Sequence, residues 1–379
     1  MKLLRIAIPL ALALAGATSA SAGASPQSDV TGHVYVNDNT AGVNTISAFD
    51  RHADGTLTPI AGSPFATDGA GTGKGIGSQG ALQESSDGRY LLAVDAGSNQ
   101  VSVLRILPHG ELAHVGGGAV SSGGNEPVSI AVSGDLVYVA NAGDGASNYT
   151  GFTLNPGGHL RPLAGSTVAL PDGSSPGDVL FNGTGTSLVG VRVNTSLIDS
   201  FAVGSDGRLK AAPSSPTAAQ GPGPFGSEFR PTDPAQLFVS NAHGGAEAGT
   251  VSAFAVSSDA TLTSIGSSPF PDFQTAPCWV EISHDGNYLF TVNTASNSVS
   301  RYAIAPGGSL ELLGSTPLDK AGAGAEDARL APDGNTLWVV ETGADALSAL
   351  AVQGGALTAL PGSTTTLPTG AAPFGVVVT

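Results

Sequence analysis

Five charged residues stand at matching places in a repeated pattern and are the first candidates for chemistry. They are Asp178, Glu228, Glu281, Asp327 and Arg329. Carboxylates crowded around one arginine have pKa values that move apart, which can supply a general base beside a cation that holds an anion. We therefore predict Glu228, Glu281 and Arg329 as catalytic residues. The alternative is a structural network in which Arg329 neutralises Glu281 and Asp327, because perturbed ion networks often serve only the fold.

Further residues are predicted to contact a ligand rather than to react. Gln83, Asp178, Trp279 and Asp327 occupy equivalent positions in the repeat, and His243 lies in an insertion. The seven histidines of the chain lack the paired spacing that is typical of metal ligands. We therefore expect no cofactor. A Ca²⁺ or Mg²⁺ ion among the carboxylates would be chemically reasonable, but no loop has the ligand spacing of a calcium site.

Two sequence markers define the repeat that aligns these residues. A turn followed by leucine, as in SDGRL and PGGSL, recurs at intervals of 47 to 55 residues. These leucines are Leu57, Leu112, Leu160, Leu209, Leu262, Leu310 and Leu357. A second marker opens an apolar run in each unit, at intervals of 48 to 53 residues, and we call these positions the lead residues. The lead residues are Gln79, Pro127, Pro176, Pro224, Pro277, Ala325 and Pro373.

Each unit contains four short segments that are typical of strands. In one unit, PCWVEIS, NYLFTVN, SVSRYAIA and SLELLGS are separated by turn sequences. Asp-Gly and Gly-Gly favour tight hairpin turns, which require positive φ. Four short strands in every ~40–50 residues are typical of a β-propeller blade. The first unit, from GHVYVNDN, lacks an innermost strand, and PFGVVV at the C-terminus matches it. We predict an all-β, seven-bladed β-propeller with four-stranded blades, in which the C-terminal strand completes blade one.

The propeller explains how distant residues meet, because its innermost strands line a central channel. Side chains alternate along a strand, so the second and fourth positions after each lead residue share a side, which we expect to face the channel. The second positions are Ala81, Ser129, Asp178, Gly226, Trp279, Asp327 and Gly375. The fourth positions are Gln83, Ala131, Leu180, Glu228, Glu281, Arg329 and Val377. The third and fifth positions are mostly apolar, as wedges between blades should be.

A second ring of polar residues ends the second strand of most units. Its members are Asn37, Asp95, Asn141, Asn241, Asn293 and Glu341. Asn and Asp are common in turns, so most residues of this second ring are interpreted as turn residues. Asp95 and Glu341 are the two that we expect at the same mouth of the channel as the lead residues.

The first twenty-two residues are predicted to be a secretory signal peptide. Lys2 and Arg5 precede the apolar run IAIPLALALAGA, and Ala20-Ser21-Ala22 is a small-x-small cleavage site. We therefore expect an exported protein whose mature domain is residues 23–379. The run is too short to anchor the chain in a bilayer.

Composition narrows the class of partner. A net charge of −16 with no basic run argues against nucleic acid and anionic membranes. Hydrophobic residues make up 41% of the chain, which excludes a disordered protein, and the 54 glycines and 25 prolines indicate many turns. Cys278 is the only cysteine, so no internal disulfide forms, and it is interpreted as a packed small residue. We expect a monomer.

Three motifs fail on their context. GSSPG at 173–177 fits Gly-x-Ser-x-Gly, but a nucleophile elbow needs a strand before it and a helix after it. GIGSQG at 75–80 fits Gly-x-Gly-x-x-Gly, but no strand–helix unit surrounds it. GTGKG at 71–75 lacks the spacing and the hydroxyl residue of a phosphate loop.

The unit SHDGNYLFTVNTASNSVSRYAI, followed by GGSLELLGS, resembles the lactonase-type seven-bladed propellers. That family is similar to the propeller-class 6-phosphogluconolactonases and the carboxymuconate cyclases, and the resemblance covers about residues 32–379. It implies a channel site of His, Arg and Glu that opens or closes a lactone. The sequence departs from this pattern in three places. PVSIAVSG has no histidine, PFGSEF stands where Pro-Arg-His is expected, and Ala242 follows Ser240-Asn241 in place of arginine.

Two hypotheses of function follow. The first is an exported lactone hydrolase or cycloisomerase, in which Glu228 or Glu281 activates water and Arg329 holds a carboxylate or an oxyanion. The second is a non-catalytic extracellular propeller that binds a ligand or a protein at its acidic mouth. A further alternative is a structural extracellular protein whose channel is only a salt-bridged core. The substrate of the first would be a small lactone or carboxylate.

Overall fold

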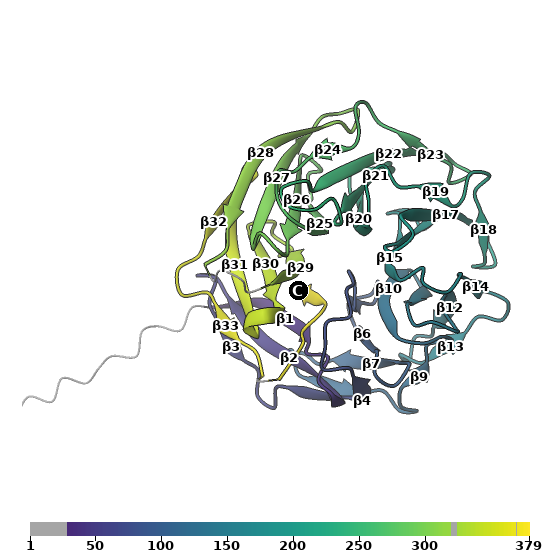
Figure 1. Ribbon diagram of the computed structural model, residues 1–379. Coiled ribbons are helices and arrows are strands. Elements are labelled where there is room, and N and C mark those ends of the chain that lie inside the picture. Colours follow the sequence, from purple (N-terminus) through teal and green to yellow (C-terminus); the bar gives the residue numbers. More distant parts are fainter. Residues whose placement is uncertain (1–28, 320–323, 369) are drawn as a thin grey trace, which may run out of the picture.

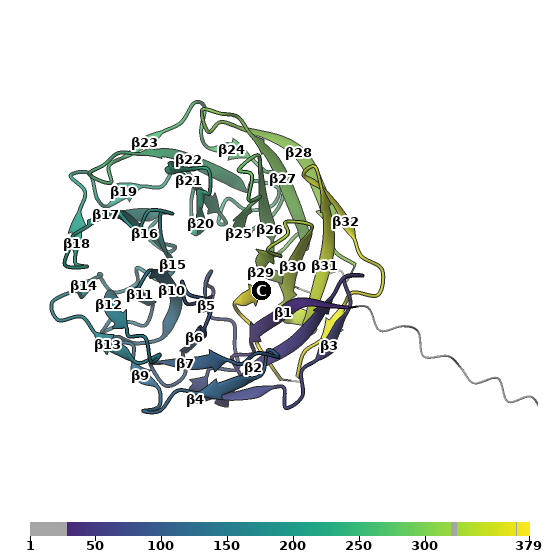
Figure 2. The ribbon, with the colours of Figure 1, turned by 180° about the vertical axis from the view of Figure 1, so that it is seen from behind.

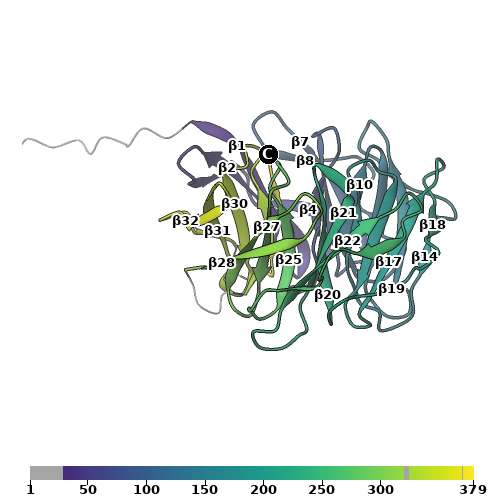
Figure 3. The same ribbon diagram turned by 90° about the horizontal axis from the view of Figure 1, so that it is seen from above.

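The structure is a computed structural model, which describes residues 29–319, 324–368 and 370–379. Over these residues the chain forms seven β-sheets arranged radially around a central axis (Figure 1). Seen from the side, the ring is a short cylinder (Figure 3). The predicted seven-bladed propeller is therefore confirmed. The predicted signal peptide lies outside the described residues. No described helix is both long and apolar enough to span a membrane.

The first and second strands of each blade form an antiparallel pair at the channel. The innermost strands, from blade one to blade seven, are β34 (Val376–Val378), β5 (Leu82–Glu84), β10 (Pro127–Ser133), β15 (Pro176–Phe181), β20 (Pro224–Arg230), β25 (Pro277–Ile282) and β29 (Ala325–Leu330). The second strands are β1 (Val30–Asn37), β6 (Tyr90–Asp95), β11 (Leu136–Asn141), β16 (Ser187–Arg192), β21 (Asp233–Asn241), β26 (Tyr288–Asn293) and β30 (Thr336–Glu341). A 3-10 turn, η1 (Thr342–Ala344), follows β30.

The third and outer strands complete each blade. The third strands are β2 (Gly42–His52), β7 (Gln100–Ile106), β12 (Asn148–Leu154), β17 (Leu197–Val203), β22 (Thr250–Val256), β27 (Ser298–Ile304) and β31 (Ala346–Gln353). The outer strands are β3 (Leu57–Pro59), β8 (Leu112–His114), β13 (Leu160–Pro162), β18 (Leu209–Ala211), β23 (Leu262–Ser264), β28 (Leu310–Pro317) and β32 (Ala356–Ala359). The seven repeated leucines thus lie at the start of the outer strands.

Each blade has the four predicted strands, and in six of the described blades the outer strand is split into two pieces. The second pieces are β4 (Phe65–Gly71), β9 (Val120–Ser121), β14 (Val168–Ala169), β19 (Thr217–Ala218), β24 (Phe270–Pro271) and β33 (Thr365–Thr366), and each pairs with the third strand. In the gap a serine hydroxyl replaces the missing strand carbonyl. Ser63 Oγ accepts the N–H of Ala48, and Ser268 Oγ accepts that of Ala253. The chain therefore turns outward without leaving a buried donor unpaired.

The ring closes as the sequence predicted. β34 pairs antiparallel with β1, with Tyr35 opposite Val377, and Thr379 exchanges backbone hydrogen bonds with His33. The C-terminus consequently lies beside β1 at the channel (Figure 2). Closure gives the inner edge of β1 a strand partner, which removes a site for aggregation.

The apolar core lies between neighbouring blades. Tyr138 of blade three packs edge-on against Phe181 of blade four, with ring centroids 6.0 Å apart. Tyr149 and Phe201 repeat this contact one strand further out, also at 6.0 Å. Such pairs are preferred over face-to-face stacking because of the ring quadrupole. The blades are thus held as a rigid scaffold around the channel.

The polar ends of the second strands form ties to the third strands. The partner lies seven residues further along the chain, as for Asp95 with Ser102 and Asn141 with Asn148. Blade four has an ion pair instead, in which Arg192 binds both oxygens of Asp199. Asp95 and Glu341, which we expected at the channel mouth, are fully buried, and Glu341 accepts a bond from Ser348. These residues are therefore structural.

Replacing Asp199 with alanine is expected to lower the free energy of unfolding by about 3 kcal/mol, because Arg192, whose side chain is 11% exposed, would be left as a largely buried charge without its partner. Tyr149, whose hydroxyl donates to Asp199 at 3.1 Å, would lose its acceptor as well. Chemical denaturation measures the change. The control is Asp206→Ala, which breaks an exposed pair with Arg208 and should cost no more than about 1 kcal/mol. Equal losses in both variants would show that the Arg192–Asp199 pair contributes no more to stability than the exposed Arg208–Asp206 pair.

Candidate functional site

The lead residues and the ends of the second strands lie on one face of the ring, here called the lead face. Pro127 pairs with Asn141 and Pro277 with Asn293, which fixes this arrangement. The hairpins between first and second strands lie on the opposite face, here called the hairpin face. Positions two after a lead residue are therefore nearer the lead face, and positions four after it are nearer the hairpin face.

Asp178 lies in the layer nearer the lead face and binds neighbouring blades to its own. Its carboxylate accepts the N–H and the hydroxyl of Ser227, at 3.0 and 2.5 Å, and the hydroxyl of Ser129 at 3.3 Å. Burial raises the pKa of Asp178 to about 7, against the lowering effect of these donors. The predicted ligand contact is thus occupied by serines of blades three and five.

Asp327 is also buried and bonded to the backbone. It accepts the N–H of Gly80 at 3.3 Å and that of Ala328 at 2.9 Å. Burial raises its pKa to about 6, and the charge of Arg329 lowers it. Trp279 donates its indole N–H to the carbonyl of Ser78 at 2.6 Å and is 2% exposed. Neither side chain presents a free group to a ligand.

Glu281 and Arg329 form an ion pair in the layer nearer the hairpin face. Their closest atoms, Oε2 and Nη1, are 3.3 Å apart, and Oε1 of Glu281 also accepts the N–H of Leu330 at 3.2 Å. Burial raises the pKa of Glu281, whereas Arg329 and the Leu330 N–H lower it. The Arg329 side chain remains 27% exposed, compared with 8% for Glu281. Arg329 can therefore hold Glu281 and still meet a ligand.

Glu228 is the least neutralised carboxyl of the group. It is partly exposed, and burial followed by the negative charge of Glu281 raises its pKa to about 8. Arg329 opposes this shift. With a pKa of about 8, Glu228 holds its proton more tightly than an ordinary carboxyl and can release it near neutral pH. A carboxyl tuned in this way beside a cation is an arrangement that acid–base chemistry can use.

The structure thus brings together all five of the predicted charged residues and separates their roles by depth. Glu228 and Arg329 are partly exposed, Glu281 is buried, and Gln83 is partly exposed in the same layer, with its amide nitrogen close to Gly80. His243 lies outside this group: it is exposed on the lead face and packs against Gly223. Cys278 is buried, and burial raises its pKa to about 12, so it is no nucleophile.

Gln79, one of the lead residues, was not predicted as a site residue, yet it supports this site. Its side chain bonds the backbones of blades five and six next to both glutamates. The sequence carried a signal for it, because five of the seven lead residues are proline and Gln79 follows a glycine-rich insertion. Among the described residues, no group of three or more His, Cys, Asp or Glu is arranged to hold a metal ion.

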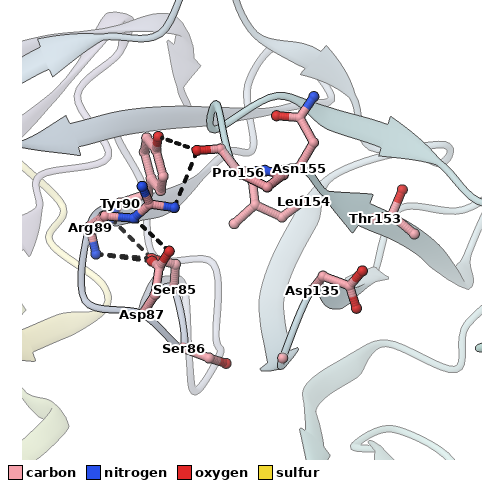
Figure 4. A pocket seen from close by; sticks show the side chains of 11 residues that line it. Ser85, Ser86, Asp87, Arg89, Tyr90, Asp135, Thr153, Leu154, Asn155 and Pro156 are labelled. Atoms are coloured by element: carbon pink, nitrogen blue, oxygen red, sulfur yellow. Dashed lines mark hydrogen bonds and ion pairs between the residues drawn. The ribbon is translucent and has the colours of Figure 1, made fainter.

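A groove of about 440 Å³ lies between blades two and three on the hairpin face, and its arginine and tyrosine are already bonded within it (Figure 4). Arg89 binds Asp87 at 2.6 Å and the carbonyl of Pro156 at 3.2 Å. The hydroxyl of Tyr90 donates to the same carbonyl at 3.1 Å. None of the channel carboxylates lines this groove. The channel therefore remains the candidate site.

Comparison with known proteins defines the class. The family "Lactonase, 7-bladed beta-propeller" matches residues 33–181 and 194–374. The chain belongs to this family of seven-bladed lactonase propellers. No curated protein sequence matches it.

Solved structures share the fold at low sequence identity. A proposed 6-phosphogluconolactonase of Bacteroides uniformis superposes with a TM-score of 0.74 at 19% identity, over 92% of this chain and 99% of that one. A Lactobacillus plantarum protein gives 0.72 at 19%, over 91% and 98%. The periplasmic gluconolactonase PpgL of Pseudomonas aeruginosa gives 0.70 at 16%, over 91% and 98%. At these identities the likeness extends to the fold alone.

Proposed function

We propose that the protein hydrolyses a small, electrically neutral lactone in the hairpin-face half of its channel. The observation that carries this proposal is Glu228, a water-accessible carboxyl with a pKa of about 8, next to the partly exposed guanidinium of Arg329 in a lactonase-family propeller. A carboxylate with a pKa near the working pH is an effective general base.

The reaction would use this chain's own residues in two roles. Ionised Glu228 removes a proton from a water molecule as the water oxygen adds to the lactone carbonyl. Arg329 stabilises the negative charge that forms on the carbonyl oxygen. When the ring C–O bond breaks, the leaving oxygen takes the proton from Glu228, and the product is a hydroxy acid. Glu281 holds Arg329 in place.

The charge of the channel supports a neutral substrate. Asp178, Glu228, Glu281 and Asp327 all influence Arg329, so four carboxyls surround one cation. A phosphate dianion would meet this negative surrounding and would be repelled. A sugar lactone without a phosphate carries no such penalty.

Glu228→Gln is expected to lower kcat by about 10²–10⁴-fold, the usual contribution of a general base. Acid release from neutral, carboxylated and phosphorylated lactones, followed in a pH-stat, measures the change. The rate of the native protein should rise as the pH approaches 8, because Glu228 must be ionised. Glu311→Gln, on the exposed outer strand β28, is the matched control and should retain full activity.

Two outcomes would contradict the proposal. A confirmed turnover that Glu228→Gln and Arg329→Ala leave unchanged would exclude this site, and a preference for phosphorylated lactones would exclude the neutral substrate. No acid release from any lactone would favour the second function, binding without turnover. The acidic surroundings of Arg329 favour a cationic ligand in that case, which calorimetry with amino sugars would detect.

A further inference from the structure

The GIGSQG segment, residues 75–80, lies in the channel between the inner strands and is here called the plug. The N–H of Gln79 donates to the carbonyl of Gly177 in blade four at 2.9 Å. The carbonyl of Gly80 accepts the N–H of Ile130 in blade three at 2.9 Å. The carbonyl of Ser78 accepts the indole N–H of Trp279 in blade six at 2.6 Å. The segment that precedes the blade-two inner strand is thus bound by three other blades.

The side chain of Gln79 is bound to the two strands that carry the glutamates. Its Nε2 donates to the carbonyl of Ser227 at 2.8 Å, and its Oε1 accepts the N–H of Val280 at 3.0 Å. Ser227 immediately precedes Glu228, and Val280 immediately precedes Glu281. One amide therefore fixes the backbone next to both carboxyls of the candidate site.

The plug also reaches the strand of Arg329. The N–H of Gly80 donates to Asp327, two residues before Arg329, at 3.3 Å. Each of the three strands that supply Glu228, Glu281 and Arg329 is therefore tied to the plug within two residues of the group it supplies. A hydrogen-bonded support of this kind sets the separation of the groups above it.

The fit is tight. Gln79 is only 4% exposed, and a Cβ atom at Gly226 would overlap with its Oε1 atom. Gly77 and Gly80 have φ values of +58° and +82°, which glycine adopts without strain. The sequence of the segment is thus matched to its path through the channel.

On the lead-face side, apolar side chains cover the plug. The Phe225 and Trp279 rings lie with centroids 5.2 Å apart, and Trp279 and Phe374 at 6.3 Å. Ile76 of the plug belongs to the same buried cluster. On the other side of the plug, Glu228 and Arg329 are partly exposed, whereas Glu281 is buried. Water therefore reaches Glu228 and Arg329 from the hairpin face.

We propose that Gln79 is a positioning residue for Glu228 and Glu281, and that its plug closes the lead-face end of the channel so that ligands enter from the hairpin face. The structural part of this inference stands without any turnover. Its consequence for catalysis rests on the proposed lactone hydrolysis. The tests below therefore use no substrate, so that their failure is distinguishable from failure of the proposed function.

The first test follows the titration of Glu228 by carbon NMR in protein labelled at the glutamate carboxyls. The chain has only nine glutamates, and Glu228→Gln assigns the signal. Gln79→Met keeps the volume but removes both hydrogen bonds. We expect the pKa of Glu228 to fall by at least one unit, because the loosened strands admit water. In Gln79→Glu, the new carboxyl can donate to Ser227 and accept from Val280 as long as it is protonated. At pH values below the pKa of this new carboxyl, the Glu228 signal should therefore follow its native titration.

The matched control is Gln236→Met. Gln236 is also buried, and its side chain bonds Asp233, Pro306 and Arg230. Arg230 ends the strand of Glu228, so this control loosens the same strand at its hairpin end and away from the plug. Both methionine variants should lower the melting temperature, but only Gln79→Met should move the titration of Glu228. An unchanged Glu228 titration in a folded Gln79→Met protein would overturn the positioning role. A Glu228 shift of equal size in Gln236→Met would do the same.

The second test measures access with a charged thiol reagent. The thiol introduced by Gln83→Cys lies on the hairpin-face side of the plug, whereas Cys278 belongs to the cluster that covers its other side. Peptide mapping after labelling should find position 83 modified at least 100-fold faster than Cys278. Equal rates, or faster modification of Cys278, would show that the lead-face end is open and would overturn the assignment of the ligand entrance.

Discussion

Removal of the last six residues, Phe374–Thr379, is expected to unfold the ring. The segment contributes the inner strand of blade one, and Phe374, Val376, Val377 and Val378 are all at least 93% buried. Each such side chain contributes roughly 1.5–3 kcal/mol when fully buried. Their sum is comparable with the total stability of a typical domain, about 5–15 kcal/mol. Circular dichroism and calorimetry of the shortened chain measure the loss.

A peptide supplied in trans provides the control. The nine-residue peptide Ala371–Thr379 should restore a cooperative unfolding transition, because it carries the residues that pair with Val34, Tyr35 and Val36. A scrambled peptide of the same composition should not. A shortened chain that unfolds cooperatively at the native temperature without the peptide would show that the ring does not depend on this closure.

The ring was predictable because its signals are local and repeated. The leucine of each outer strand follows residues that are typical of a turn. Comparison of Gly32–Asn37 with the later units showed that the first unit lacks its innermost strand. The split outer strands were missed, although a serine recurs at the split, as at Ser63, Ser215 and Ser268. A side chain that substitutes for a backbone carbonyl leaves no mark in hydrophobic periodicity.

The candidate site was predictable only in part. Alternation along the inner strands placed Asp178, Glu228, Glu281 and Arg329 on one side, and in the structure these groups influence one another's pKa values. Alternation says nothing of depth, however, so Asp178 was treated like Glu228 although serines enclose it. Depth is set by the plug, whose path depends on contacts with five other blades. A glycine-rich insertion gives no local pattern from which such a path could be derived.

The layers have different chemistry because they differ in what satisfies each carboxyl. Asp178 and Asp327 accept hydrogen bonds from N–H and O–H groups of neighbouring blades. These buried carboxyls therefore hold the blades together. Glu228 remains partly open to water and has its pKa raised by burial and by Glu281. A proton can therefore be exchanged at Glu228 without breaking a tie between blades. Replacing a tie and replacing Glu228 should thus have separable effects on stability and on activity.

Stability is expected to fall as the pH rises from about 4.5 to about 8, since burial raises the pKa of several carboxyls. Besides Asp178 and Glu228, the pKa is raised to about 7 for Asp38, about 6 for Asp272 and Asp327, and about 8 for Glu326. In this window the folded chain keeps protons that the unfolded chain has lost, so a rising pH favours unfolding. One unit of difference between the folded and unfolded pKa of a group changes the free energy of unfolding by about 1.4 kcal/mol. A few such units, summed over these groups, therefore change it by more than about 4 kcal/mol.

The melting temperature should therefore be higher at pH 5.5 than at pH 8.5, and calorimetry over this range measures the slope. The exposed carboxyls with lowered pKa, such as Asp206 and Asp259, lose their contribution only below their usual values and do not enter this window. The self-repulsion of a chain with a net charge of −16 acts in the same direction. A constant or rising melting temperature between pH 5.5 and 8.5 would contradict this expectation.

Glu326→Gln separates one carboxyl from the others. The hydroxyl of Thr342 lies 2.6 Å from Glu326 Oε2 and 2.7 Å from the carbonyl of Pro373, and its single proton can serve only one of them. A protonated Glu326 donates to Thr342, which then donates to Pro373, and a glutamine amide can do the same at any pH. The variant should match the native stability near pH 4.5 and exceed it increasingly up to about pH 8. If the two proteins keep the same difference at every pH, Glu326 is ionised in the folded chain and the closing segment at Pro373 is held without its proton.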